Sequence, residues 1–327
     1  MAEYHYRTHA EVRDWEALIR ELSALEGLTF SHYDGVVHAT PSFLQWYTAR
    51  PGLKRGLCQA AFAGNKLVCN VFVTLARMRL GGGPVICGLV DTVMTHPDHR
   101  RRGLATALLE RALRAMESEG ADLSLLYTAR AEAVLPPERL YQRLGYAPRE
   151  LVTRLLRPAR PAEGSPSVLM PPDASARQVF DQSLSRHDGW LLLDDDLWRW
   201  RRQQRPREYP VALLGTASGG AAALCTGELI MSGAPLPVSV ISDLVLPAGA
   251  AARGALDALL ACAPAEAAIT VLCPQSEVQR ERLLLEAGFA PSGVEVAMLR
   301  PISERGRAAL RAPAAPWYVA VESVIGV

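Results

Sequence analysis

The sequence contains almost no lysine and only scattered cysteine. All but two of its 35 basic residues, Lys54 and Lys66, are arginine, and its six cysteines form no CxxC pair and no cluster with histidine. Zinc sites and disulfide frameworks both need cysteines at recognisable spacings. We therefore expect reduced thiols in the core and no bound metal.

Long apolar runs and an excess of one charge are missing as well. No run approaches the roughly 20 residues that a membrane-spanning helix needs, and the first 16 residues are too polar for a signal peptide. The formal net charge is +1, whereas nucleic-acid binding requires a basic surface that displaces counterions. We expect a cytoplasmic protein that binds neither membranes nor nucleic acids. Its oligomeric state is left open by the sequence.

Length and composition indicate two globular domains. The chain has 327 residues, of which 49% are hydrophobic and 21% charged, and domains usually contain about 100–200 residues. A stretch rich in proline and small residues lies near the middle. We expect a first domain at 1–158, a linker at 159–173 and a second domain at 174–327.

Hydrophobic periodicity predicts an α/β (α+β) fold. Apolar residues recur at helical spacing over 11–26 and again from Gly103 to Gly120, a typical helix stop. The remaining apolar runs predict strands, the first three of which are separated by glycine-containing turns: 57–63, 67–75, 85–94, 121–129 and 151–155. We expect a mixed, mainly antiparallel sheet flanked by helices.

Parts of this pattern occur a second time. Residues 253–260 (RGALDALL) resemble 102–109 (RGLATALL), and 281–291 (ERLLLEAGFAP) resemble 138–148 (ERLYQRLGYAP). The offsets are 253 − 102 = 151 and 281 − 138 = 143, so they differ only by loop lengths. Because the landmarks keep their order, we predict two tandem copies of one fold.

A strand, a turn and a helix start follow one another in 90–106, VDTVMTHPDHRRRGLAT. A helix start presents unpaired N–H groups and the positive end of the helix dipole, which together suit a pyrophosphate. Gly103 and Ala105 leave the backbone accessible, Thr106 can add a hydroxyl, and the three preceding arginines add charge. The alternative is an arginine-rich helix start on a solvated surface.

This segment resembles the R/Q-x-x-G-x-G/A signature of the GNAT superfamily of acyltransferases, and Thr-His-Pro-Asp-His before it resembles that family's V-x-P-x-x pattern. The resemblance implies acetyl-CoA as the acyl donor. It also implies a bulged strand that separates from its neighbour, with the pantetheine arm between 93–95 and 125–128. The residues expected to hold the cofactor are Val93, Met94, Thr95, Arg100, Arg101, Arg102, Gly103, Leu104, Ala105 and Thr106.

The segment 140–146, LYQRLGY, resembles the family's LYxxxGF/Y helix, whose tyrosine protonates the departing CoA thiolate in many members. The resemblance implies Tyr141 as the general acid, and a phenol with a pKa near 10 can donate to a thiolate when held close. The alternative is a core aromatic, which we expect Tyr146 to be. For the general base, Asp91 and Glu132 are both candidates, and neither lies at a position that the motifs fix.

The second copy departs from these motifs. Leu284 stands at the place of the acid, Leu256 at that of Ala105, and Ala251 opposite the first loop arginine. An isobutyl group cannot donate a proton, and a leucine obstructs the backbone where a phosphate must approach. We therefore expect catalysis in the first copy only, with the second copy as a scaffold or a wall of the substrate site.

Together these features predict an N-acyltransferase. We expect an acetyl group to move from acetyl-CoA to a small-molecule amine or a peptide N-terminus by direct attack in a ternary complex. A different interpretation is a sensor or assembly module that binds acyl-CoA without catalysis, because a fold alone does not establish an activity.

Overall fold

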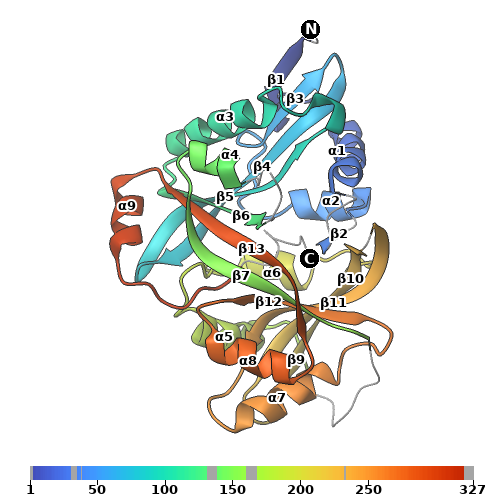
Figure 1. Cartoon of the computed structure of the whole chain (residues 1–327), viewed down its shortest axis with the longest axis vertical. Helices are drawn as coiled ribbons and strands as arrows, with labels where there is room; N and C mark the ends of the chain where they lie inside the picture. Colours follow the sequence, from blue (N-terminus) through green and yellow to red (C-terminus); the bar gives the residue numbers. More distant parts are fainter. Residues whose placement is uncertain are drawn as a thin grey trace.

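The computed structural model describes residues 3–30, 35–37, 39–130, 138–159, 168–231 and 233–319, and Figure 1 shows them as two halves joined through one sheet. The elements of the first half are β1 (Tyr4–Thr8), η1 (His9–Glu11), α1 (Trp15–Phe30), β2 (Val36–Val37), α2 (Pro41–Thr48), β3 (Gln59–Ala63), β4 (Lys66–Leu80), β5 (Gly83–Thr95), η2 (Pro97–His99), α3 (Leu104–Ser118), β6 (Leu123–Ala129), α4 (Glu138–Arg143) and β7 (Ala147–Arg157). Those of the second half are β8 (Val168–Met170), α5 (Ala174–Leu184), α6 (Asp195–Arg202), β9 (Val211–Gly215), β10 (Ala221–Met231), β11 (Ala234–Val245), α7 (Ala251–Leu260), β12 (Ala268–Pro274), α8 (Val278–Glu286), β13 (Ala290–Pro301) and α9 (Glu304–Arg311). None of the described helices combines the length and the apolar character needed to cross a membrane.

The strands of both halves form one 13-stranded sheet. Its order is β1-β3-β4-β5-β6-β13-β7-β12-β11-β10-β9-β8, with β2 paired to β10. Two neighbouring pairs, β5 with β6 and β11 with β12, are parallel, and the other pairs are antiparallel. The predicted mixed, mainly antiparallel sheet is confirmed, although the strands of the two halves are joined in it.

The two halves follow one order of elements. The series β3-β4-β5-α3-β6-α4-β7 corresponds to β9-β10-β11-α7-β12-α8-β13. The last strand of each series pairs with a strand of the other half: β13 pairs with β6, and β7 pairs with β12. The two last strands, β7 and β13, also pair with each other. The predicted linker, 159–173, includes β8 and the N-cap residue of α5. A division of the chain at this linker stays a proposal, since each half completes the sheet of the other.

Helix α3 covers one face of the first half because its sequence supplies an apolar stripe. Its buried residues recur every three or four positions: Leu104, Leu108, Leu109, Ala112, Leu113 and Met116. The helix gives way to Gly120, whose φ of +75° stops it. Beneath the helix lies Gly88, where a Cβ would come within 2.0 Å of the Met116 sulfur. A side chain at this glycine would therefore require the Met116 side chain to move.

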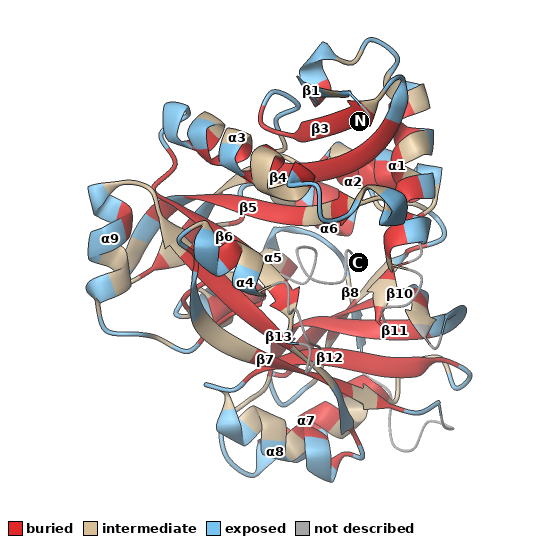
Figure 2. Cartoon of the chain, turned by 45° about the horizontal axis from the view of Figure 1, so that its top comes forward, coloured by how far each residue is buried: buried red, intermediate tan, exposed pale blue. Residues whose placement is uncertain are grey.

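The two halves share an inner core. Buried residues of α1 and α2 from the first half and of α5 and α6 from the second form one cluster, while two further clusters lie under α3 and under α7. Trp46 of α2 and Trp200 of α6 stack with their ring centroids 4.4 Å apart, and each indole N–H donates to the other's backbone carbonyl, at 3.3 and 2.9 Å. A reciprocal contact of this kind is typical of two-fold related units. Figure 2 shows that the central strand β12 is buried as well, and so is the middle of β13, from Glu295 to Leu299.

Candidate functional site

A β-bulge interrupts the pairing of β4 and β5 next to the predicted phosphate loop. Between the pairs Asn70–Met94 and Phe72–Asp91, two residues of β5 lie opposite one residue of β4. The first of them, Thr92, has a φ of +49°, in the left-handed region that β-branched residues rarely adopt. The bulge that the family resemblance implies is therefore present in this strand.

Beyond the bulge, β5 separates from β6. The parallel ladder joins only 87–89 to 123–125, and no described strand pairs with the β6-facing edge of the residues that follow in β5. The N–H of His96 donates to a carbonyl of β4, and backbone groups alternate in direction along a strand. The N–H and C=O of Val93 and Thr95 therefore face the gap between β5 and β6, whereas those of Met94 face β4.

Helix α3 begins at Leu104, close to the end of this gap, and no side chain caps it. The first N–H groups of a helix have no partner within the helix. Its N-cap residue, Gly103, has a φ of +77°, and a Cβ there would meet no atom within 4 Å. The helix start is thus an open group of N–H donors at which an anion can bind.

The three arginines of the loop, Arg100, Arg101 and Arg102, are exposed beside this helix start. The Nε of Arg100 lies 3.4 Å from the carbonyl oxygen of Thr95, at the end of β5. Arg102 donates to the hydroxyl of Tyr4 at 2.9 Å, which ties the loop to β1. The positive charge at the helix start is therefore held near the gap.

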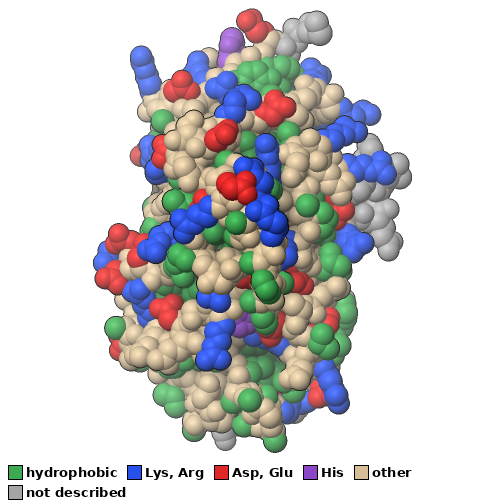
Figure 3. All heavy atoms as spheres, turned by 90° about the vertical axis from the view of Figure 1, so that its left-hand side faces the viewer, with side chains coloured by type: hydrophobic (Ala, Val, Ile, Leu, Met, Phe, Trp, Pro, Cys, Tyr) green, Lys and Arg blue, Asp and Glu red, His purple; other side chains and the backbone are tan. Residues whose placement is uncertain are grey.

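Charges of both signs are mixed on the face that carries α9, where Figure 3 shows arginine side chains among acidic ones. Glu304 of α9, for example, pairs with Arg307 at 2.7 Å and with Arg311 at 2.9 Å. Exposed pairs of this kind contribute little to stability. They do neutralise part of the arginine charge on this face.

Asp91, a candidate base, has both carboxylate oxygens engaged. Its Oδ2 lies 2.8 Å from a guanidinium nitrogen of Arg50, and its Oδ1 accepts a hydrogen bond from the Thr92 hydroxyl at 2.9 Å. Asp91 and Arg50 are both buried, and the guanidinium carbon lies 4.4 Å from the centre of the Tyr47 ring. This geometry favours a structural link between α2 and the bulge, and the role of Asp91 as a base stays an untested prediction.

Tyr141, the predicted acid, is buried on α4. It shares the core cluster under α3 with Val90 and Leu126, the residues at which β5 and β6 begin to separate. Its ring contacts the ring of Tyr146 edge-on, with centroids 6.1 Å apart, and Tyr146 is a buried core aromatic as expected. The role of Tyr141 as the acid stays a prediction, and Glu132 lies outside the described residues.

Two side chains at the bulge, those of Asn70 and His9, are not among the residues that the sequence motifs predict. The Nδ2 of Asn70 donates to the carbonyl of Thr92 at 3.1 Å, and the Oδ1 of Asn70 lies 2.8 Å from the Nε2 of His9. Both side chains are fully buried. For Asn70 the sequence does contain a signal, namely an asparagine inside an otherwise apolar strand, because a buried polar group needs a hydrogen-bonding partner. The sequence around His9 gives no comparable signal.

The cysteines are core residues, as predicted. Five of the six are buried, and burial raises the pKa of Cys58 to about 12 and that of Cys69 to about 11. These two side chains are therefore protonated near neutral pH and are poor nucleophiles. In the part of the chain that the structure describes, no three His, Cys, Asp or Glu side chains gather as a metal site would require.

The second half contains the same kind of bulge. The register of β10 against β11 shifts in the same way, and Asp243 has a φ of +52°. The separation 243 − 92 = 151 between this residue and Thr92 equals the first offset of the sequence repeat. The parallel ladder of β11 and β12 joins only 238–241 to 268–271, so these strands also separate.

The helix start of the second half differs from that of the first. Helix α7 begins at Ala251, so Gly254, which stands at the place of Gly103 in the sequence repeat, lies inside the helix and not at its start as the repeat predicts. The positive φ of this loop lies instead at Gly249, because the shorter loop lets the helix begin earlier. Leu256, which we expected to obstruct a phosphate, is buried in the core under α7 together with Leu284.

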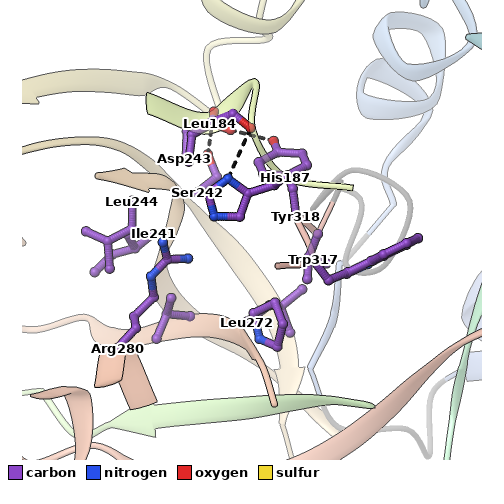
Figure 4. A pocket seen from close by; sticks show the side chains of 13 residues that line it. Leu184, His187, Ile241, Ser242, Asp243, Leu244, Leu272, Arg280, Trp317 and Tyr318 are labelled. Carbon is purple, nitrogen blue, oxygen red and sulfur yellow. Dashed lines mark hydrogen bonds between the residues drawn. The ribbon is translucent and has the colours of Figure 1, made fainter. Parts of the chain in front are cut away.

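The chain itself fills the second gap. Trp317, Tyr318 and Val319 line it together with the separated ends of β11 and β12, and a cavity of about 30 Å³ remains. This volume holds roughly one or two water molecules. Figure 4 shows Tyr318 joined to Asp243, to which its hydroxyl donates. A pantetheine arm has no room here.

Comparison with known proteins gives a family for the first half. Residues 26–149 match the family model of the acetyltransferase (GNAT) domain. A search of curated proteins found no match for the sequence.

Solved structures with the same fold extend over both halves. Saccharomyces cerevisiae N-myristoyltransferase with bound myristoyl-CoA has 13% identity and a TM-score of 0.71 over 92% of this chain and 79% of its own. A GCN5-related N-acetyltransferase from Anabaena variabilis has 16% identity and a TM-score of 0.61, over 92% of this chain and 73% of its own. Eis1 from Mycobacterium abscessus has 18% identity and a TM-score of 0.54, over 94% and 76%. The fold and the motif sequences agree with this match, which identifies residues 26–149 as similar to the acetyltransferase (GNAT) domain.

Proposed function

We propose that the first half transfers an acyl group from acyl-CoA to an amine, with acetyl-CoA as the donor. The observation that carries this proposal is the gap between β5 and β6, where an open strand edge and an uncapped helix start lie together. The yeast neighbour contains bound myristoyl-CoA, which supports a CoA thioester as the ligand of this fold.

The residues around the gap suit the parts of the donor. The N–H groups of Gly103, Leu104, Ala105 and Thr106, with the charges of Arg100, Arg101 and Arg102, would hold the pyrophosphate. The gap-facing backbone groups of Val93 and Thr95 would hold the pantetheine arm and the thioester carbonyl, as a neighbouring strand would. Met94 faces β4 and would contribute only by its place in the strand.

The chemistry that follows is a direct transfer. The amine nitrogen attacks the thioester carbonyl, the C–N bond forms as the C–S bond breaks, and Tyr141 gives its proton to the departing thiolate. The proton that the amine loses goes to a base, for which Glu132 remains a candidate beside Asp91. Holding both reactants in the gap supplies much of the rate, because it replaces an encounter in solution.

The acceptor is proposed as a small-molecule amine or a peptide N-terminus. The second half, whose own gap is filled by Trp317, Tyr318 and Val319, would act as scaffold or substrate wall in a tandem architecture with one active copy. A cytoplasmic location and the absence of nucleic-acid and membrane partners belong to the same proposal.

The test is thiol release from acetyl-CoA in the presence of polyamines, aminoglycosides, amino acids and peptides with free N-termini. Myristoyl-CoA, the ligand of the yeast neighbour, serves as the comparison donor. Release that depends on both an amine and acetyl-CoA supports the proposal. Calorimetric binding of acetyl-CoA without release by any amine would favour the sensor interpretation, and no binding would reject both.

A further inference from the structure

Thr92 is held in an unfavourable backbone conformation at the point where β5 turns into the gap. A left-handed φ costs a β-branched residue of this kind more than it costs glycine, so the surroundings must impose it. Val93 and Thr95, one and three residues further along the chain, are the residues whose backbone groups face the gap. Whatever fixes Thr92 therefore also fixes these groups.

A buried row of hydrogen bonds reaches Thr92 from the α1 side of the sheet. The carbonyl of Thr92 can only accept, so the amide nitrogen of Asn70 faces it and the amide oxygen of Asn70 faces His9. The Nε2 of His9 must then carry a proton and donate at 2.8 Å. Burial lowers the pKa of His9 to about 4, so the imidazole is neutral near physiological pH and the row keeps one direction.

A second set of contacts holds the same residue by its side chain. The Thr92 hydroxyl donates to Asp91, which is fixed in turn by Arg50. The bulge residue is thus fixed through its carbonyl by His9 and Asn70 and through its hydroxyl by Asp91. The side chains that hold Thr92 in the two sets, those of His9, Asn70, Asp91 and Arg50, are all buried.

The second half lacks this arrangement although it keeps the bulge. The position of Asn70 is taken by Ala221, since 221 − 70 = 151, and the bulge residue there is Asp243. Asp243 pairs with the charges of Arg201 and Arg202 and accepts a hydrogen bond from the Tyr318 hydroxyl. At the open gap, a neutral row of hydrogen bonds that ends on the backbone carbonyl of the bulge residue accompanies the Asp91–Arg50 pair. At the filled gap, the bulge residue is itself a member of an ionic cluster.

We propose that His9 and Asn70 are positioning residues for acyl transfer, which act by holding the Thr92 carbonyl so that the backbone groups of Val93 and Thr95 face the gap. The proposal rests on the function proposed above. It predicts a loss in turnover that exceeds the loss in CoA affinity, because the pyrophosphate of CoA would bind at the start of α3 and only the pantetheine arm would lie along Val93 and Thr95.

The test compares Asn70→Ala, His9→Ala and His9→Gln, with Thr74→Val as a control that removes a different buried polar group of β4, the Thr74 hydroxyl. We expect Asn70→Ala to lower kcat by roughly 100-fold, the range for misplacing a reacting group by about an ångström. His9→Ala should lower kcat by roughly tenfold, and His9→Gln, which keeps a donor for Asn70, should restore most of it. Calorimetry should give each variant a Kd for free CoA within roughly threefold of wild type, and Thr74→Val should keep the wild-type kcat.

Hydrogen exchange measured by mass spectrometry separates this proposal from the proposed function. In Asn70→Ala the peptide that covers 90–96 should exchange faster, while peptides of β10 and β11 should not change. Unchanged exchange in this peptide, or a wild-type kcat in an Asn70→Ala protein that is folded, would overturn the positioning role. If Asn70→Ala does not fold, equal kcat values for His9→Ala and His9→Gln would overturn it. Absence of thiol release by the wild type would reject the proposed function, and the exchange result would still decide how the bulge is held.

Discussion

The two gaps of this molecule follow the same kind of β-bulge, but the first is open and the second is filled by the chain. In both, a residue with positive φ, Thr92 or Asp243, turns a strand away from its parallel neighbour. The first gap opens beside an uncapped helix start with three exposed arginines. The second is closed by Trp317, Tyr318 and Val319, and only about 30 Å³ remains.

The comparison teaches that the backbone feature alone does not make a ligand site. The bulge and the gap persist in the second half, where the chain fills the space and the helix start has moved to Ala251. The side chains and loop lengths around the bulge therefore decide whether the gap can receive a ligand.

Blocking the first helix start should have the largest effect. We expect Gly103→Glu to abolish acetyl-CoA binding in calorimetry, because it places bulk and negative charge where the pyrophosphate is expected. Gly103→Ala is the matched control for the strain of a side chain at a φ of +77°, and it should retain more of the affinity.

The same substitution in the second half sharpens the contrast. Gly254 lies inside α7, and a Cβ there would meet no atom within 4 Å. The substitution Gly254→Glu should therefore leave one acetyl-CoA bound per chain. A stoichiometry near two in the wild type, reduced to one by Gly254→Glu, would show that the second half is also a site.

Removing the proposed acid should come next. We expect Tyr141→Phe to lower kcat by roughly tenfold to ten-thousandfold while the affinity for acetyl-CoA changes little, because a positioned proton donor is lost. Tyr146→Phe is the control from the same segment, since its hydroxyl is already bonded to Ser124, and it should alter stability more than turnover. Unchanged kcat for Tyr141→Phe under saturating substrate would exclude it as the acid.

Breaking the ionic cluster of the second bulge should reduce stability but not acyl transfer. Asp243 is buried and faces two arginines, so Asp243→Asn leaves buried positive charge without its partner. We expect a loss of about 3–5 kcal/mol in the free energy of unfolding, the range for breaking a buried ion pair. Urea unfolding measures it, and an undiminished midpoint would mean that other groups neutralise the arginines.

The first bulge should instead make the protein sensitive to acid. His9 has a pKa of about 4 in the folded chain against 6.5 as its ordinary value, so the unfolded chain binds more protons as pH falls from 6.5 to 4. The folded state should lose about 3 kcal/mol over this interval because of His9, while the contribution is complete above pH 6.5. In His9→Gln the difference in unfolding free energy between pH 7 and pH 4 should shrink by about that amount. Parallel pH curves for the two proteins would contradict this assignment.

Local signals in the sequence predicted most of the first half. Its strands and turns follow from apolar runs bounded by glycines, and β3, β4 and β5 lie where these runs predict them. The first helix was displaced toward the N-terminus in the prediction, because the apolar spacing begins at Val12 whereas α1 begins at Trp15, after η1. Periodicity is insensitive to such a short helical turn before a helix.

Features that depend on distant residues could not be predicted. The sequence of β13 does not indicate that it pairs with β6 instead of a strand of its own half. Several strand edges have a similar apolar character, so the apolar pattern does not distinguish between them. The partners of Asn70 and Asp91 are 61 and 41 residues away along the chain, in η1 and beyond α2. The sequence repeat matches Gly254 to Gly103 and so predicts a helix start there, which is wrong because the matching residues lie about one turn inside α7.

The place of β13 in the sheet also has a consequence for how the chain can be made. When the ribosome has translated residue 158, all strands of the first half have been synthesised. The edge of β6 still lacks its neighbour, β13, because β13 consists of residues 290–301. Until then an apolar edge of seven residues is open to pairing with other chains. Synthesis of the first half alone should therefore yield an aggregating product, and the chain can be neither divided nor recombined at its middle without supplying that last strand.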